Sequence, residues 1–131
     1  MGVLAVYGVK DAAMRIYYGL HNLQHRGQEG GGIGTFDSSG KYHRHRGLGL
    51  LSEIFTNGEL GHLPGEMGIG SVKYSNDAND GLECVEPLFF HHKGGDFAVA
   101  CDGNVINAKQ IADYLEKRGV IFQTADRKSV V

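Results

Sequence analysis

Hydrophobic and polar positions along the chain predict short strands and helices in alternation. An apolar, β-branched run from Val3 to Tyr7 predicts a buried strand. Apolar residues at helical spacing follow, from Asp11, whose side chain can cap a helix, to about Gln24. The apolar face of that helix consists of Ala12, Ile16, Leu20 and Leu23. The chain therefore begins with a strand and an amphipathic helix.

A hairpin and further short elements are predicted next. The segments "GGGIGTFD" and "KYHRHRGLGL" have strand character, and "DSSG" between them supplies the residues of a tight turn. The other predicted elements are the helical turn "LSEIF", the strand "EMGIGSVKYS", the polar loop "SNDANDG" and the buried strand "GDFAVACDG".

A second helix is predicted near the end of the chain. Asn107 can cap it, it runs to about Lys117, and Gly119 closes it. Its inward residues are expected to be Ile111, Tyr114 and Leu115. The segment "VIFQT" then predicts another strand. Because the strands come in hairpins, the pattern favours a layered α+β fold over a doubly wound parallel sheet.

Composition narrows the class of protein only modestly. The 131 residues fit one domain, and the net charge of −2 gives no electrostatic reason to expect nucleic acid or a membrane as partner. No apolar run approaches the roughly 18 residues of a membrane span. Cys84 and Cys101, in a chain without a signal peptide, are expected to be free thiols. The expected location is the cytoplasm.

Residues 17–34, "YYGLHNLQHRGQEGGGIG", carry a family resemblance. Together with "GLGLLSEIF", "GIGSVKYS", "DGNVINA" and "GVIFQT" in the same order, they resemble the glutaminase domain of amidophosphoribosyltransferase, an enzyme of purine biosynthesis. The most specific piece is Gln24–Gly30. The resemblance implies an αββα sandwich of the N-terminal-nucleophile hydrolases and a glutamine amidotransferase type 2 domain. Residues 1–131 would form that domain, incomplete at its C-terminal end, and no cofactor is implied.

The resemblance also implies a catalytic machinery that this chain lacks in part. Such a glutaminase needs an N-terminal cysteine, whose thiolate attacks the glutamine amide while its own α-amine acts as the base. Here that place holds Met1, or Gly2 if the initiator is trimmed, and neither can form a thiolate. The family's oxyanion loop carries Asn-Gly, whereas this chain has Asp102 and Gly103. An anion there would repel the developing oxyanion.

The substrate-binding places implied by the resemblance are also altered, so we regard them as vestigial. Arg26 and Gly27 match residues that line the glutamine site, although a structural role at the helix end and a turn is favoured for both. Lys73 stands where the family has an arginine that holds the glutamine carboxylate. Arg127 aligns with the family's acid for the glutamine ammonium, and Asp126 replaces it only through a one-residue shift.

Cysteine and histidine patterns offer weaker signals. Cys101 is expected to be a small buried hydrophobe, because strand alternation turns it away from the face of Asp102. Cys84 has no nearby histidine pattern. His21 and His25 share a face of the predicted helix, and His43 and His45 share a face of a predicted strand. These pairs leave a histidine metal site open as an alternative. No metal is expected at the resemblance-derived site.

Three functions follow from these observations. The first is a catalytically degenerate glutaminase-like domain that serves as a binding, regulatory or assembly module, with glutamine or a related small molecule as a possible ligand. The second is a partial or altered copy of a true glutaminase domain, and the third is a histidine-based metal-binding protein. Because "GVLAVY", "DFAVAC" and "GVIF" look apolar enough for central strands, a second copy or a partner chain is expected to complete the sandwich.

Overall fold

A four-stranded antiparallel sheet forms the centre of the computed structural model, which describes residues 1–74 and 81–122. The strand order is β1-β4-β2-β3, and each neighbouring pair is antiparallel. The strands are β1 (Gly2–Tyr7), β2 (Gly30–Phe36), β3 (Tyr42–Leu48) and β4 (Met67–Lys73). The predicted hairpin of β2 and β3 and the α+β class are therefore confirmed.

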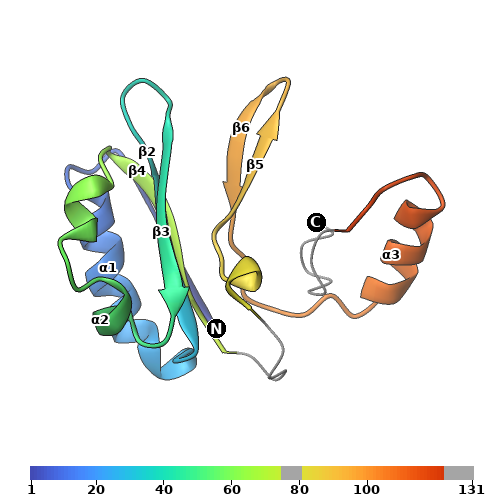
Figure 1. Cartoon of the computed structure of the whole chain (residues 1–131), viewed down its shortest axis with the longest axis horizontal. Helices are drawn as coiled ribbons and strands as arrows, with labels where there is room; N and C mark the ends of the chain where they lie inside the picture. The colour runs from blue at the N-terminus through green and yellow to red at the C-terminus, as the bar shows by residue number, and fades with distance from the viewer. Residues whose placement is uncertain (75–80, 123–131) are drawn as a thin grey trace.

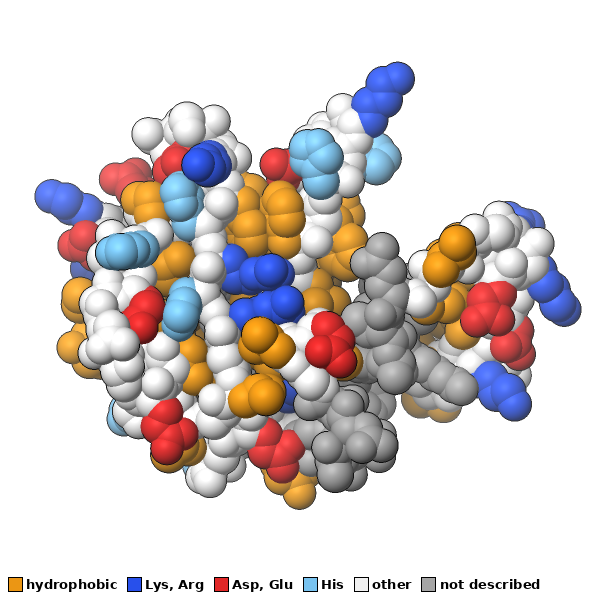
Figure 2. Space-filling view, viewed as in Figure 1, with side chains coloured by type: hydrophobic (Ala, Val, Ile, Leu, Met, Phe, Trp, Pro, Cys, Tyr) orange, Lys and Arg blue, Asp and Glu red, His pale blue; other side chains and the backbone are white. Residues whose placement is uncertain are grey.

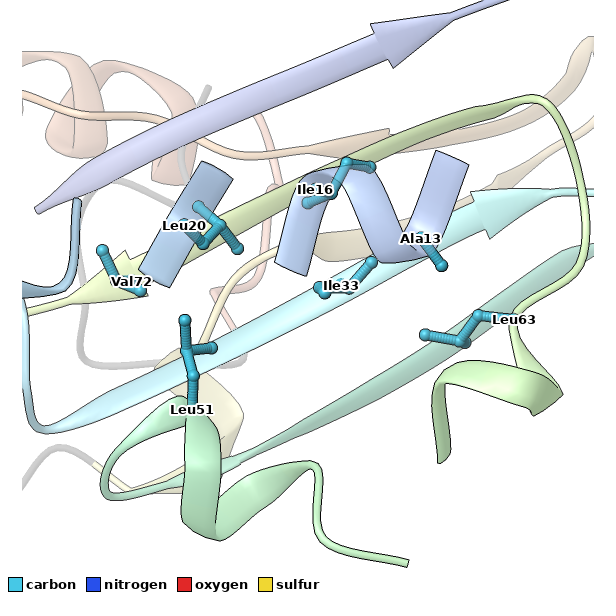
Figure 3. Close-up of a cluster of buried hydrophobic side chains, with 7 residues drawn as sticks. All are labelled: Ala13, Ile16, Leu20, Ile33, Leu51, Leu63 and Val72. Carbon is cyan, nitrogen blue, oxygen red and sulfur yellow. The ribbon is translucent and has the colours of Figure 1, made fainter. Parts of the chain in front are cut away.

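Helix α1 (Ala12–Leu23) covers one face of this sheet and creates the hydrophobic core. Ile16 and Leu20 are completely buried, as the apolar spacing predicts. Figure 3 shows them between α1 and the strands that carry Ile33 and Val72, and α2 (Leu51–Ile54) closes the layer with Leu51. Burial of this apolar face is the main stabilisation of the first layer.

A second, smaller layer lies against the opposite face of the sheet (Figure 1). It is the hairpin of β5 (Leu88–His92) and β6 (Gly95–Val99). The chain enters it close to β2, where a Cβ atom on Gly32 would lie 2.6 Å from the Glu86 carbonyl oxygen. The ring of Phe89 stacks on Tyr42 of β3 with centroids 4.4 Å apart. Glycine on β2 thus permits close approach of the two layers; the pattern analysis missed β5.

The last helix, α3 (Ala108–Glu116), stands away from both layers (Figure 1). Three short 3₁₀ turns link the other elements: η1 (Gln24–Arg26), η2 (Glu59–His62) and η3 (Leu82–Cys84). The prediction that Tyr114 points inward is wrong, because the helix has little to pack against and this side chain is 53% exposed. No strand forms over 119–122. The remainder of "VIFQT" and most of the loop "SNDANDG" lie outside the described residues.

Several other local predictions are corrected. Strand β1 lies at the edge of its sheet, so it is not buried on both sides, and β6 is largely exposed. Asp11 and Asn107 precede their helices as predicted, yet neither side chain makes a capping hydrogen bond. Asp11 has a left-handed backbone, with φ 58°, and contributes its carbonyl oxygen to the first helical bond from Arg15. Apolar spacing therefore predicted where the two helices lie, but it did not predict the backbone geometry or the capping at their N-termini.

Candidate functional site

The beginning of the chain meets the end of helix α1. The Met1 amine donates a hydrogen bond to the carbonyl oxygen of Arg26 in η1. Gly2 is buried there, and a Cβ atom on it would lie 3.1 Å from the Leu23 Cβ atom. The first residue of β1 is therefore held beside the "QHRGQEG" segment.

Gly27 brings the same segment against the end of β4. A Cβ atom on Gly27 would lie 2.7 Å from the carbonyl carbon of Lys73, which no ordinary contact allows. Its φ of −172° is extended backbone, so close packing, rather than the predicted turn, explains this glycine. The Glu29 N–H donates to the Lys73 carbonyl oxygen at 3.1 Å and extends the contact. Lys73 itself is only 5% exposed.

An ion pair crosses from η1 to the segment after β6. The guanidinium of Arg26 lies 3.2 Å from the carboxylate of Asp102, and both side chains are partly exposed. Such a partly solvated pair contributes about 0.2–1 kcal/mol. Arg26 does tie the helix end to another element, as predicted, although that element belongs to the second layer rather than to the first sheet. Gly103, with φ 146°, follows in a conformation that favours glycine.

Most of the predicted site residues are therefore neighbours in space. Met1, Arg26, Gly27, Lys73 and Asp102 are linked by the hydrogen bond, the ion pair and the close packing just described. Asp126 and Arg127 lie outside the described residues. The cluster combines the Met1 amine with the paired side chains of Arg26 and Asp102, and Lys73 joins it through its backbone. Opposite charges of this kind are suited to holding a small zwitterionic molecule. The cluster offers no thiol at residue 1.

A buried glutamate near this cluster was missed by the sequence reasoning. Glu86 is 5% exposed, and its carboxylate accepts the Cys101 N–H at 2.7 Å. Its carbonyl oxygen also accepts the Ser71 hydroxyl at 2.9 Å. Buried carboxylates need such partners. The sequence signal was slight, since only the adjacent Pro87 marks this segment as unusual.

Neither cysteine forms a disulfide with another described residue, and the environment of Cys101 is the opposite of the one predicted. Cys101 is exposed, because it follows β6 rather than lying within it, so the prediction of a small buried hydrophobe is wrong. Cys84 is buried in η3. Neither occupies the place of a nucleophile next to the Met1 amine.

The histidines make protein contacts rather than converging. His43 lies 2.8 Å from the Asp37 carboxylate, His45 lies 2.9 Å from the Ile54 carbonyl oxygen, and His25 lies 3.1 Å from that of Asn22. In the described part of the chain, no three His, Cys, Asp or Glu side chains are placed to hold a metal ion. In the same residues, no helix is long and apolar enough to cross a membrane.

Curated proteins similar in sequence to this chain are amidophosphoribosyltransferases. The chain is 44% identical over 131 residues to the amidophosphoribosyltransferase of Bacillus subtilis (strain 168), covering 99% of this chain and 27% of the relative. It is 41% identical over 130 residues to amidophosphoribosyltransferase 1, chloroplastic, of Arabidopsis thaliana, covering 99% of this chain and 23% of the relative. No family model matches it. The chain thus spans about a quarter of the length of these curated relatives.

Solved structures give the fold in detail. The glutamine phosphoribosylpyrophosphate amidotransferase from B. subtilis, complexed with ADP and GMP, superposes with a TM-score of 0.90 at 44% identity, over 99% of this chain and 28% of that one. A structure described as the allosteric regulatory enzyme of purine biosynthesis gives a TM-score of 0.92 at 44% identity, with the same coverage of both chains.

The antiparallel layers, with a helix outside the first sheet, define a partial N-terminal-nucleophile hydrolase sandwich, as predicted. More particularly, the chain is homologous to the N-terminal glutaminase domain of amidophosphoribosyltransferases.

Proposed function

We propose that this chain is a catalytically degenerate glutaminase domain that serves as a binding or assembly module in the cytoplasm. The identity of residue 1 carries the proposal. A methionine thioether has no proton to lose and cannot attack an amide as a thiolate does. If Met1 is trimmed, Gly2 brings no side chain at all. The contact of the Met1 amine with the Arg26 carbonyl oxygen supports this assignment of residue 1 to the nucleophile position, where it brings no thiol.

The Asp102 carboxylate supports the same proposal independently of residue 1. Stabilising a tetrahedral oxyanion requires a donor, and loss of one such donor typically lowers the rate about 10²- to 10³-fold. Asp102 brings a negative charge instead and forms an ion pair with the Arg26 guanidinium. Even with a cysteine at residue 1, the Asp102 carboxylate would therefore repel the oxyanion that forms in the transition state.

Ammonia release from glutamine tests the proposal. The purified chain is expected to release none above background, and Met1→Cys, prepared with a free amine at residue 1, is expected to remain nearly inactive. Met1→Cys combined with Asp102→Asn is the sharper variant, because it restores both the thiol and the amide donor. Activity of the unmodified chain would overturn the proposal, and removal of Cys84 and Cys101 in turn would then locate the relocated nucleophile.

A second candidate is a partial or altered copy of a true glutaminase domain. It is favoured by the gathering of Arg26, Gly27 and Lys73 around the start of β1. On this reading, robust turnover would return with Met1→Cys alone. Glutamine binding without turnover, measured by calorimetry, supports the degenerate module with glutamine or a related amino acid as its ligand.

Assembly is the other role that we propose, with a second copy of this chain as partner. On the sheet face opposite α1, the β1 end is incompletely covered: Tyr7 is 83% exposed and Met67 is 40% exposed. Tyr7 and Met67 are direct cross-strand partners, so the exposed surface is continuous. Soluble monomers rarely expose large continuous apolar areas, and a symmetric contact buries the same patch twice.

Sedimentation equilibrium at micromolar concentration tests self-association. Tyr7→Ser is expected to weaken the dimer, whereas Tyr18→Ser, at another exposed tyrosine on helix α1, leaves it unchanged. A monomer at all concentrations would contradict the assembly role while leaving the catalytic proposal untouched.

A further inference from the structure

Two arginines on the open edge strand β3 form a cationic pair that the proposed function does not use. Arg44 and Arg46 are two residues apart, so they project from the same face of the strand. That face is turned toward the second layer, because both guanidiniums donate to carbonyl oxygens of the segment that leads into β5. Figure 2 shows Lys and Arg side chains (blue) gathered between β3 and this segment.

The hydrogen bonds of the pair leave most of its donors available. Arg46 donates through one terminal nitrogen to the Val85 carbonyl oxygen at 2.7 Å and to that of Glu83 at 3.4 Å. Arg44 donates through one terminal nitrogen to the Pro87 carbonyl oxygen at 3.4 Å. A guanidinium carries five N–H donors, so within the described residues each side chain keeps its Nε–H and second terminal nitrogen unbonded.

The hydrogen-bond acceptors of the pair are neutral. Neither arginine forms an ion pair in the described part of the chain, and every acceptor just named is a neutral carbonyl. Burial, followed by the charge of Arg44, lowers the pKa of Arg46, and the weaker influence of Glu83 opposes this shift. An exposed and a partly buried guanidinium side by side repel each other, and an anion between them removes that repulsion.

The pair is covered on its sheet side and open to solvent on the other. The Tyr42 ring and the Glu86–Pro87 segment lie over Gly34 and Gly32, the β2 residues opposite Arg44 and Arg46. Arg44 is exposed, so a small ligand reaches the pair from solvent. Tyr42 lies next along the same face, and its hydroxyl is buried with no hydrogen-bond partner among the described residues. Burial raises the pKa of Tyr42 to about 12, so the phenol stays neutral and adds no negative charge.

We infer that Arg44 and Arg46 form a binding site for a phosphate group. A carboxylate has two oxygens, which a single guanidinium fork can satisfy. A phosphate group has at least three terminal oxygens and close to two negative charges at neutral pH, so it engages both arginines at once. The ligand is either free phosphate or a small phosphate monoester, and both present the same terminal oxygens.

Titration of the full chain with inorganic phosphate, at constant ionic strength set by chloride, tests the site. Saturable binding at about millimolar phosphate is expected, with shifts of the arginine Nε–H resonances of Arg44 and Arg46 in ¹H–¹⁵N spectra. Arg44→Gln should weaken binding at least tenfold while preserving the fold, because its one hydrogen bond is long. Arg15→Gln is the matched control: it removes the same charge, and Arg15 also makes one 3.4 Å bond to a carbonyl oxygen.

Glycerol 3-phosphate and acetate serve as the two comparison ligands. Tighter binding of glycerol 3-phosphate identifies a monoester as the ligand, and equal binding identifies free phosphate; both support the site. Acetate binding as strong as phosphate binding would overturn the phosphate assignment. Absence of saturable binding, or equal weakening by Arg15→Gln and Arg44→Gln, would overturn the site itself.

Discussion

The two faces of the four-stranded sheet differ in how completely the chain covers them. On the α1 face, Ile16, Leu20 and Val72 are fully buried. On the other face, the β5–β6 hairpin covers β2 and β3, while Tyr7 and Met67 of β1 and β4 remain exposed. Helix α1, together with the short α2, closes one side of this small sheet, whereas a two-stranded hairpin does not close the other.

The largest expected effect is on the closed face. Leu20→Ala removes a fully buried side chain from the core and is expected to lower the free energy of unfolding by about 2–5 kcal/mol. Met67→Ala on the open face should cost less than about 1 kcal/mol, because that side chain is already partly in water. Urea unfolding followed by far-UV circular dichroism measures both. Equal losses would contradict the asymmetry of the two faces.

The contact between the layers can be broken at one glycine. Gly32→Ala places a methyl group 2.6 Å from the Glu86 carbonyl oxygen and 2.8 Å from the Arg46 Cβ atom. We expect a loss of about 1–3 kcal/mol, with faster amide hydrogen exchange in β5 and β6 than in β2. Gly61→Ala, in η2 with open space around it, is the control. Unchanged exchange in the hairpin would mean that the layers meet elsewhere.

The ion pair between η1 and the second layer is a weaker link. Arg26→Gln should change the free energy of unfolding by no more than about 1 kcal/mol, and the loss should shrink further at high salt. Asp102→Asn is expected to give the same small change. Their double variant should show little additional loss, because both single changes remove one interaction. Fully additive losses would contradict a direct pair.

The smallest expected effect is confined to acidic pH and to the β2–β3 turn. The Ser39 hydroxyl, followed by His43, holds the pKa of Asp37 well below its usual range, and the N–H groups of Ser39 and Lys41 also donate to this carboxylate. Because the folded pKa is depressed, the stabilisation is present above the unfolded pKa of about 4 and is lost as the pH falls below it.

Asp37→Asn should therefore flatten the fall in stability between about pH 4 and pH 2. Asp113→Asn, at an exposed aspartate of α3, is the control and should leave that slope unchanged. The midpoint of urea unfolding as a function of pH is the measurement. An identical slope in the Asp37 variant and the parent chain would show that this turn does not contribute to acid stability.

Sequence reasoning located elements better than it judged their surroundings. Helix α1 and strands β2, β3 and β4 were predicted from apolar spacing and turn residues, because these are local properties. Burial of β1 and β6 was predicted wrongly, since an apolar strand has the same composition at an edge as at the centre of a sheet. For the same reason Tyr114 was placed inward on a helix that stands apart.

At the candidate site, too, the sequence identified individual residues but not the contacts between distant segments. Residues of the "QHRGQEG" motif and Lys73 were identified from resemblance, and the fold brings them to the start of β1. The ion pair of Arg26 with Asp102 joins residues that are far apart in the sequence, so no spacing rule predicts it. Glu86 and the pair of Arg44 and Arg46 were not singled out, because their significance depends on burial and on neighbours from another layer.

The sequence by itself determined the first layer and the chemical identity of residue 1. Apolar periodicity fixes which side of α1 is buried, and a methionine has no thiol in any fold. Only the tertiary structure decided which strand lies at the edge, why Gly27 must lack a side chain, and which charges meet. Those properties depend on contacts between segments distant in the chain, where packing and electrostatics act over a few ångströms of space regardless of sequence separation.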